Sequence, residues 1–267
     1  MFFSRRSVFK SILSVIGYLS LSKSSLGNNQ NLAGKNVIVI GAGISGLVAT
    51  STLVDQGANV IILEAKNYIG GRIKTDRSLG ASFEYGAGWI HGPSKENPIR
   101  NLADHSKSSL FITDDDSAKL FNLFGDDIDE TVWDEIEEIW EEIMYEEIGS
   151  DTEGSILDAI NEYNPNIWKD PKIRWIFSAY TEFDYGGPVP KISASLITEM
   201  RGFSTADVIF KNGYDRIITL LANNLQIQTN SIVKSVNYSN PKNITVSTQS
   251  KNYECDYLIC AVPLGVL

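Results

Sequence analysis

The chain has 267 residues, 43% of them hydrophobic and 10% aromatic, enough for one large domain or two modest ones. Its formal net charge is −10, and because the first thirty residues hold four basic residues and no acid, the remainder carries −14. This balance argues against nucleic acid and anionic membranes as partners and favours cationic ones, although an acidic surface kept for solubility explains the charge equally well.

Residues 1–30 resemble an export signal. Residues 4–10 read SRRSVFK and are followed by SILSVIGYLSLS, an apolar run too short to form a stable membrane span. The paired arginines resemble the bacterial twin-arginine signal, although Val8 and Phe9 stand where Phe and Leu are usual and no clear A-x-A site follows. We therefore expect export to the periplasm or the cell exterior, with an ordinary secretory signal or an uncleaved anchor as the alternative.

The pattern changes at residues 36–40, which read NVIVI, an unbroken apolar run typical of a strand buried in a parallel sheet. The following GAGISG places Gly41, Gly43 and Gly46 in the G-x-G-x-x-G spacing. Gly41 would make the tight turn, Gly43 would let the backbone approach a pyrophosphate, and Gly46 would let a helix pack closely. Residues 44–56 read as that helix, whose N-terminal N–H groups would bind the phosphates.

A second strand, NVIIL, leads to Glu64, eighteen residues after Gly46. A carboxylate there can accept hydrogen bonds from an adenosine ribose. Shortly afterwards, Gly70 and Gly71 permit a second close approach of the backbone, and Arg72 supplies positive charge for a pyrophosphate. Together these features predict a dinucleotide-binding α/β fold.

This arrangement resembles the flavin-containing amine oxidase superfamily, which includes monoamine oxidases, polyamine oxidases, L-amino-acid oxidases and the flavin histone demethylases. The resemblance implies FAD as cofactor. It also implies a fold in which a Rossmann-like FAD-binding domain, with a parallel sheet and helices, is interleaved with an α+β substrate domain.

Residues 83–99 read FEYGAGWIHGPSKENPI and look most like the polyamine-oxidising branch, where a W-I-H-G loop runs over the flavin. The resemblance implies that Gly88 and Trp89 contact FAD and that His91 faces the substrate near the ring. An imidazole there could deprotonate an amine or hydrogen-bond to it, since it titrates near neutral pH. The alternative is a surface turn in which Trp89 anchors the core.

Residues 126–148 carry apolar side chains at steps of three and four, opposite an almost wholly acidic face, and so predict an amphipathic helix. That face could concentrate polycations or simply be solvated. Ser155 is predicted to cap the next short helix.

A later helix breaks near Gly186. Within it, Glu182 matches an acid that approaches the amine in polyamine oxidases, although Tyr185 and two glycines stand where relatives often have Ala-Glu-Pro. The alternative for Glu182 is a helix-end acid that faces water.

The chain then returns to the cofactor domain. Gly213 and Tyr214 match a recurrent pair of the family, Val233 stands where relatives clamp adenine, and Pro263 is predicted to end the last central strand. The cysteines, Cys255 and Cys260, are too far apart on an extended strand to pair, so we expect buried thiols and no metal site. The resemblance assigns the following residues to FAD: Gly41, Gly43, Ile44, Ser45, Gly46, Glu64, Ala65, Gly70, Gly71, Arg72, Gly88, Trp89, Val233 and Pro263.

These predictions give a domain order and a function. We expect an export signal at 1–30, FAD-binding segments at 31–105 and 206–267, and a partly helical substrate domain at 106–205. Relatives continue for about as long again and supply a flavin-site lysine and an aromatic cage there, so we expect this chain to lack the C-terminal half.

The predicted activity is oxidation of a C–N bond of a small amine, with a polyamine as the leading substrate, FAD as cofactor and O2 reduced to H2O2. His91 and Glu182 are the candidate catalytic residues. Two alternatives remain: another flavin oxidoreductase of the same scaffold, such as an L-amino-acid oxidase or a desaturase, and a truncated fragment that binds FAD without catalysis.

Overall fold

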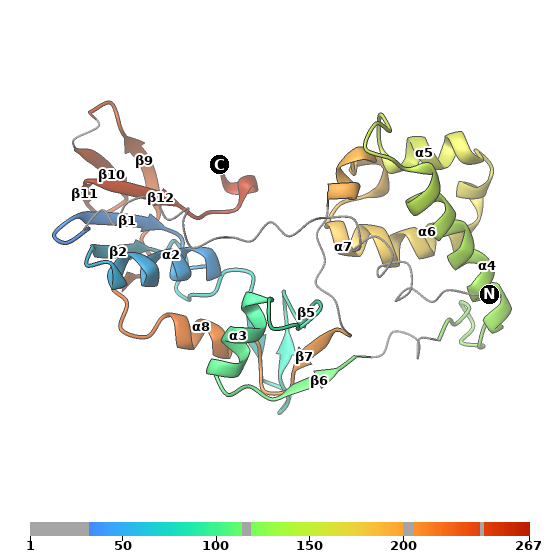
Figure 1. Cartoon of the computed structure of the whole chain (residues 1–267), viewed down its shortest axis with the longest axis horizontal. Helices are drawn as coiled ribbons and strands as arrows, with labels where there is room; N and C mark the ends of the chain where they lie inside the picture. Colours follow the sequence, from blue (N-terminus) through green and yellow to red (C-terminus); the bar gives the residue numbers. More distant parts are fainter. Residues whose placement is uncertain (1–31, 114–118, 200–205, 241–242) are drawn as a thin grey trace. The chain divides into compact units, whose positions relative to one another are not determined.

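The computed structural model describes residues 32–113, 119–199, 206–240 and 243–267, so the predicted export signal lies outside the described residues. The chain forms two compact units (Figure 1). Unit 1 contains the described parts of Met1–Thr113 and Phe203–Leu267, and unit 2 contains those of Asp114–Gly202. Unit 2 is therefore an insertion in the sequence of unit 1.

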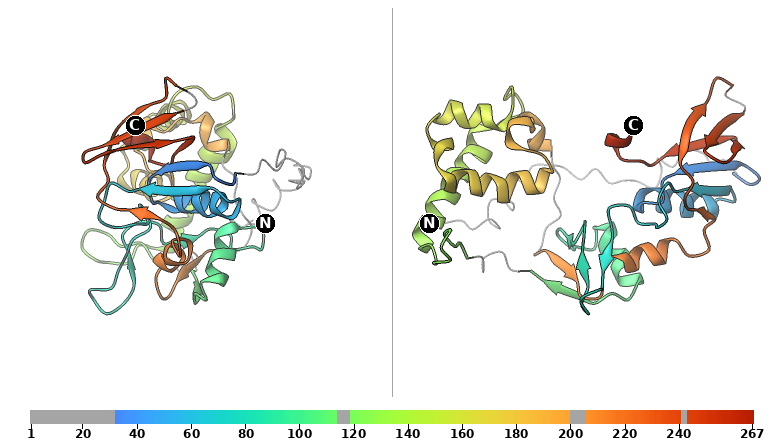
Figure 2. Two further views of the ribbon diagram at one scale, coloured as in Figure 1. Left: turned by 90° about the vertical axis from the view of Figure 1, so that its left-hand side faces the viewer. Right: turned by 180° about the vertical axis from the view of Figure 1, so that it is seen from behind.

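Unit 1 is built on a four-stranded parallel sheet with the order β12-β1-β2-β8. Its strands are β1 (Asn36–Ile40), β2 (Asn59–Leu63), β8 (Ile227–Gln228) and β12 (Tyr257–Cys260). Strands β1, β2 and β12 lie side by side in the views of Figures 1 and 2.

Both faces of the central strand β1 are covered, which explains its unbroken apolar run. Val37 and Val39 pack with Leu47 of α2 (Ile44–Asp55) on one face. Ile38 packs on the other face with Val246 of an antiparallel sheet. That sheet has the order β11-β10-β9, formed by β9 (Val233–Asn237), β10 (Ile244–Thr248) and β11 (Asn252–Cys255). Unit 1 is thus layered here as helix, parallel sheet and antiparallel sheet.

The cysteines differ from the expectation of two buried thiols. The chain changes sheets at Asp256, so Cys255 ends β11 and is buried, whereas Cys260 ends β12, an edge strand, and is exposed. Burial raises the pKa of the Cys255 thiol. Strand β12 ends at Cys260, three residues before Pro263, which begins a short 3-10 turn instead.

A second region of unit 1 contains a three-stranded antiparallel sheet with the order β5-β7-β6 and a two-stranded ladder. The elements are β3 (Thr75–Asp76), β4 (Phe83–Glu84), β5 (Trp89–Ile90), α3 (Pro98–His105), β6 (Leu110–Ile112), β7 (Val208–Phe210) and α8 (Asp215–Leu221). Because β6 pairs with β7, the sequence as far as Thr113 belongs to unit 1, whereas we expected the substrate domain to begin at 106.

Within its described residues, unit 2 is helical, with isolated β-bridges but no longer strand. The predicted amphipathic helix begins at Glu130, because Asp129 caps it, and continues from α4 into a π-helical turn. Its stripe of Ile136, Trp140 and Ile143 lies in the core. The helical segments are α4 (Glu130–Glu141), the π-turn Glu142–Glu147, α5 (Ile156–Tyr163), α6 (Pro171–Phe177), the π-turn Ser178–Glu182 and α7 (Phe183–Tyr185), with short 3-10 turns at Ile167–Lys169, Val189–Lys191 and Ser195–Glu199. No described helix of the chain has the length and apolar character needed to cross a bilayer.

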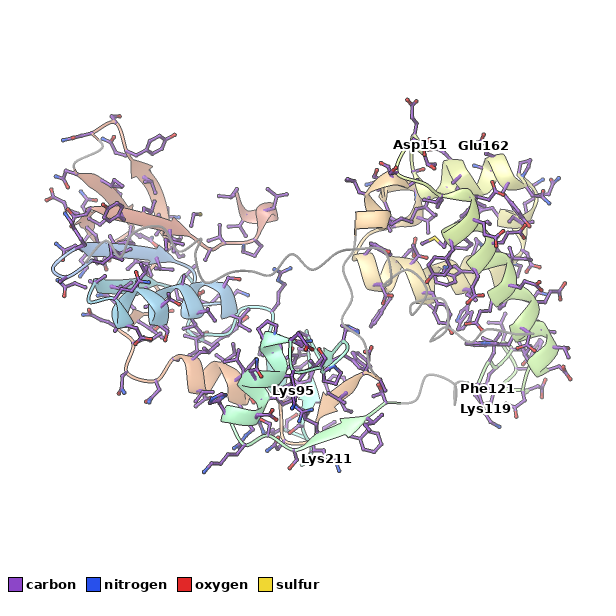
Figure 3. The ribbon with its side chains drawn as sticks, in the orientation of Figure 1. Lys95, Lys119, Phe121, Asp151, Glu162 and Lys211 are labelled. Atoms are coloured by element: carbon purple, nitrogen blue, oxygen red, sulfur yellow. The ribbon has the colours of Figure 1, made fainter. Side chains whose placement is uncertain are left out.

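Charge is divided unevenly along the chain. The sequence of unit 2 contains 23 acidic and 6 basic residues, a net charge of −17. The sequence of unit 1, by contrast, contains more basic than acidic residues. Asp151 and Glu162, for example, project from unit 2 into solvent, whereas Lys95 and Lys211 lie on unit 1 (Figure 3). Unit 2 is therefore a strongly acidic body.

The helix α5 yields the first testable prediction. Ser155 accepts a hydrogen bond from the Asp158 N–H at 3.2 Å, and the Asp158 carboxylate accepts one from the Ser155 N–H at 2.8 Å, forming a capping box. We expect Ser155→Ala to lower the free energy of unfolding of the chain by about 1 kcal/mol. Thermal unfolding measures this effect. Ser150→Ala, at a nearby exposed position, is the control, and an equal loss in both variants would contradict the capping role.

Candidate functional site

The loop between β1 and α2 lies at the carboxyl end of the parallel sheet and leads directly into the start of helix α2. Helix α2 has Gly43 as N-cap, with no side-chain cap and no acid in the first turn. Its first N–H groups, at Ile44, Ser45 and Gly46, have no acceptor within the helix. A side chain on Gly43 would meet nothing within 4 Å. This end of α2 is therefore open to an anion such as a pyrophosphate.

A second glycine loop lies against the first. Gly43 and Gly70 form an isolated parallel bridge, and the Gly70 N–H donates to the Ala42 carbonyl at 2.8 Å. Gly70 has a φ of +102°, which favours glycine, and a Cβ there would lie 2.6 Å from the Ile73 carbonyl oxygen. Arg72 is exposed and forms no ion pair with another described residue. Its guanidinium thus remains available for an anion.

The predicted ribose carboxylate lies at the same place. Glu64 follows β2, and its two carboxylate oxygens accept hydrogen bonds from the Ala42 N–H at 2.7 Å and the Lys66 N–H at 2.8 Å. These bonds hold the carboxylate against the first glycine loop, with Ala65 exposed beside it. Because each carboxylate oxygen can accept two hydrogen bonds, Glu64 can also accept from a ribose hydroxyl.

A third glycine, Gly86, was missed by sequence reasoning. A Cβ on Gly86 would overlap the Arg72 carbonyl oxygen, and the Ala87 N–H donates to that oxygen at 3.1 Å. Gly88, which we did predict, meets only ordinary contacts. The signal was present in the sequence, because residues 86–88 repeat the Gly-Ala-Gly of residues 41–43. The segment leading to Trp89 is thereby held against the second glycine loop.

Trp89 and His91 lie on one open face of the small sheet. Side chains alternate along extended backbone, and Ile90 is 2% exposed, so Trp89 lies on the opposite face of β5, where it is 41% exposed. His91 is the first residue after β5, and continued alternation places it on the face of Trp89. Strand β5 pairs with β7 in the register Trp89↔Ile209 and Ile90↔Val208. Continuing this register sets His91 opposite Asp207.

The Asp207 carboxylate contacts the His91 loop through both oxygens. One oxygen lies 2.6 Å from His91 Nδ1, and the other accepts the Gly92 N–H at 2.9 Å. The His91 side chain is nonetheless 73% exposed. Sequence reasoning missed Asp207, because the two residues are 116 positions apart and nothing local marks their pairing.

Asn97 binds the backbone of the same loop. Its buried side chain donates to the carbonyls of His91 at 2.9 Å and Gly92 at 3.3 Å, and accepts the Ile99 N–H at 2.9 Å as the cap of α3. One amide therefore joins the start of a helix to the backbone of the histidine loop.

The Gly213–Tyr214 pair is fixed by an acid that we did not predict. Glu84 accepts hydrogen bonds from the Tyr214 N–H at 2.8 Å and the Thr75 hydroxyl at 2.7 Å. Burial, assisted by the nearby Glu84 charge, raises the pKa of Tyr214 to about 12. The pair Arg77–Asp215, at 2.7 Å, adds a second link between the β3–β4 region and α8.

The last two predicted contacts also lie in unit 1. Val233 begins β9, close to Ser231, whose N–H donates to the Glu64 carbonyl at 2.8 Å. Pro263 lies two residues after Ala261, and the Ala261 carbonyl oxygen would lie 3.0 Å from a Cβ on Gly41. Apart from Gly88 and Trp89, which lie at the small antiparallel sheet, the predicted FAD residues lie in the loops near the carboxyl ends of β1, β2 and β12, where open α/β sheets bind ligands.

Glu182 lies in unit 2 and has structural partners there. One carboxylate oxygen accepts the Val189 N–H at 2.8 Å, and the other accepts the Ser178 hydroxyl at 3.0 Å. The carboxylate thus spans the turn around Gly186, which has a φ of +68°. Its role toward a substrate stays a prediction.

Comparison with known proteins identifies the family. A model of the flavin containing amine oxidoreductases matches residues 44–267. The chain belongs to this family. The family and the fold confirm the expectation of an FAD-dependent scaffold with a parallel sheet, and the roles of the individual site residues stay predictions.

Several relatives share extended similarity with the chain. Probable polyamine oxidase 4 of Arabidopsis thaliana is 30% identical over 265 residues, covering 91% of this chain and 53% of that protein. Polyamine oxidase 1 of Zea mays is 28% identical over 286 residues, covering 93% and 57%. A solved putrescine oxidase variant, made in a redesign of cofactor binding, superposes with a TM-score of 0.63 at 21% identity, covering 86% of this chain and 58% of its own. The chain spans about half the length of the curated relatives it matches.

Two glycines of the first loop give a matched prediction. We expect Gly43→Ala to keep the fold but weaken FAD retention, because the new methyl group projects into the open space beside the phosphate-binding N–H groups. Gly46→Ala would place a Cβ on the Gly41 carbonyl oxygen and cost about 1–3 kcal/mol of folding free energy.

Thermal unfolding of the chain without cofactor, and FAD titration followed by flavin fluorescence, measure the two effects. An equal loss of stability in both variants, or unchanged FAD affinity in Gly43→Ala, would contradict this division of roles.

Glu182 gives a prediction about stability. We expect Glu182→Ala to lower the free energy of unfolding by about 1–2 kcal/mol, because the N–H of the buried Val189 loses its acceptor. Denaturant unfolding measures the loss, and Glu162→Ala, at an exposed position of the same unit, is the control. Unchanged stability in Glu182→Ala would show that the turn does not depend on this carboxylate.

Proposed function

We propose that this chain forms the FAD-binding and amine-facing part of an exported amine oxidase whose substrate is an aliphatic polyamine. The observation that carries the proposal is the run from Gly86 to His91. It starts against the second glycine loop and ends with Trp89 and His91 on an open face, so one segment joins the predicted cofactor site to a candidate amine-binding group. The names of the relatives support an amine as substrate.

The residues present fit FAD. The uncapped start of α2 would bind the pyrophosphate, Arg72 would neutralise its charge, and Glu64 would accept from the ribose. The open space beside Gly43 is the cradle that a close approach requires. When bound, FAD supplies the two-electron oxidising power for a C–N bond, and O2 then accepts those electrons to give hydrogen peroxide.

The chain's own residues would prepare the amine. A protonated amine has no lone pair on nitrogen and must lose a proton before its C–N bond is oxidised. His91, through Nε2, would accept that proton or a hydrogen bond from the substrate nitrogen. Trp89, on the same face, would exclude water beside it.

A polyamine is favoured over a monoamine or an amino acid by charge. Unit 2 carries a net −17, and a field of that sign attracts a polycation more strongly than a zwitterion. The second candidate is an L-amino-acid oxidase, which would use an arginine to bind the substrate carboxylate. The open face that holds Trp89 and His91 offers a carboxylate instead, that of Asp207.

The cellular location is part of the proposal. The paired arginines and the short apolar run at residues 4–22 support export through a twin-arginine-type route, which carries folded proteins. Fusion of residues 1–30 to a reporter that is active only after export would test this location. A reporter retained in the cytoplasm would contradict it.

Substrate oxidation is the test of the proposed function. The full chain, supplied with FAD, would be assayed for hydrogen peroxide with spermine, spermidine, their acetyl forms, tyramine and L-amino acids. We expect release with the polyamines that weakens as salt is raised, because screening reduces long-range attraction. Turnover of amino acids alone would favour the second candidate. A chain that binds no FAD would contradict the proposal.

A further inference from the structure

We infer that Asp207 is a positioning residue that fixes the ring tautomer of His91 and leaves His91 Nε2 as the proton acceptor on the open face. The substrate side of this inference rests on the proposed function. The state of the ring does not, because it follows from contacts within unit 1.

The geometry assigns the proton on the ring. Asp207 uses one oxygen to accept the Gly92 N–H at 2.9 Å, and its other oxygen lies 2.6 Å from His91 Nδ1. An ionised carboxylate can only accept hydrogen bonds, so the neutral imidazole must carry its proton on Nδ1. Nε2 is then an unprotonated acceptor, and the ring is 73% exposed on the face it shares with Trp89.

The backbones of Asp207 and His91 are each held by hydrogen bonds of their own, in addition to the contact between the two side chains. Residue Asp207 adjoins β7, where its carbonyl accepts the Thr113 N–H at 2.9 Å and the Thr113 hydroxyl at 3.2 Å. On the other side, the buried Asn97 binds the carbonyls of His91 and Gly92. An exposed ion pair alone would contribute little and would not orient the ring. Here the carboxylate joins two anchored segments, so it can select one tautomer.

The tautomer matters because it decides what Nε2 can do. With the proton on Nδ1, Nε2 can accept from an ammonium group, and the Asp207 carboxylate stabilises the imidazolium that forms. With the proton on Nε2, that atom would be a donor and would point a hydrogen at a substrate N–H. A misoriented or wrongly protonated histidine loses much of its value as a base even when it stays in place.

Asp207→Asn reverses this arrangement with little change in shape. The new amide would have only one oxygen for two donors, the Gly92 N–H and the His91 Nδ1–H. Its NH2 group would therefore face one of these donors. The conflict is removed if the amide oxygen accepts from Gly92, the NH2 group donates to Nδ1, and the ring proton moves to Nε2. The variant therefore favours the opposite tautomer.

Nitrogen NMR of the full chain reads the tautomer directly, because the chain has only two histidines. His105 is an internal reference: its Nδ1 lies 2.6 Å from the Asn101 carbonyl, which can only accept, so it too carries the proton on Nδ1. His105→Gln assigns the signals. At alkaline pH we expect both rings to be protonated on Nδ1 in the wild type and only His91 to switch in Asp207→Asn.

A wild-type His91 protonated on Nε2, or a ring that Asp207→Asn leaves unchanged, would overturn the inference. The wild-type spectrum is decisive even if the variant folds poorly. It also tests the ring assignment separately from the proposed function, since no substrate or cofactor is needed.

The kinetic consequence is tested by a double-mutant cycle on the FAD-loaded chain. With an active amine substrate, we expect Asp207→Asn to lower kcat/KM on the order of 100-fold, with FAD affinity unchanged. In a His91→Ala background the same substitution should have no further effect, because Asp207 acts through the ring. An equal loss in both backgrounds would overturn the positioning role. If the wild type oxidises no amine, the proposed function fails while the NMR result still stands.

Discussion

The structure of unit 1 depends on close contact between backbone segments at the carboxyl ends of its parallel strands. Gly46 lies against the Gly41 carbonyl, Gly70 against the Ile73 carbonyl, and Gly86 against the Arg72 carbonyl. A side chain at these positions would overlap a carbonyl oxygen or crowd it closely. The bridge between Gly43 and Gly70 joins the start of α2 to the second glycine loop, and the contact of Gly86 with Arg72 joins that loop to the segment that leads to Trp89. The predicted cofactor site is the surface that these contacts create.

Polar groups then fix what the glycines bring together. Glu64 is tied to the first loop by the Ala42 N–H, and Glu84 is tied to the Tyr214 N–H. In both cases the carboxylate accepts a hydrogen bond from a backbone N–H of a different segment. The bond therefore holds the two segments together and also fixes the orientation of the carboxylate. Glu64 keeps acceptor capacity for a ligand, and this makes it both a structural and a candidate binding residue.

The insertion of unit 2 separates segments of unit 1 that pair with each other. The strand that carries Trp89 pairs with β7, which follows the whole of unit 2 in the chain. That pairing brings Asp207 to His91 across 116 positions. An acidic helical body and a candidate amine-binding face therefore belong to one polypeptide, in a family of flavin-dependent amine oxidoreductases.

Local rules explain most of what could be predicted. The G-x-G-x-x-G spacing, the apolar run of β1 and the cap Ser155 depend on neighbouring residues and on periodicity. These features were sufficient for the fold class, the cofactor loops and the start of several helices. The end of the first segment of unit 1 and the edge position of β12 were less well predicted. The first depends on the pairing of β6 with β7 and the second on the order of the parallel sheet, and both involve distant partners.

The sequence by itself determined the dinucleotide scaffold and the family, because glycine spacing and strand patterning are read over a few tens of residues. Only the tertiary structure decided which residues each site residue contacts. Asp207 beside His91, Glu84 beside Tyr214, and the engagement of Glu182 with Val189 each join side chains to backbone through folding. The first two pairs are more than a hundred positions apart, and no periodicity spans that distance. Carboxylates are common in this chain, so only their geometry distinguishes a positioning acid from a solvated one.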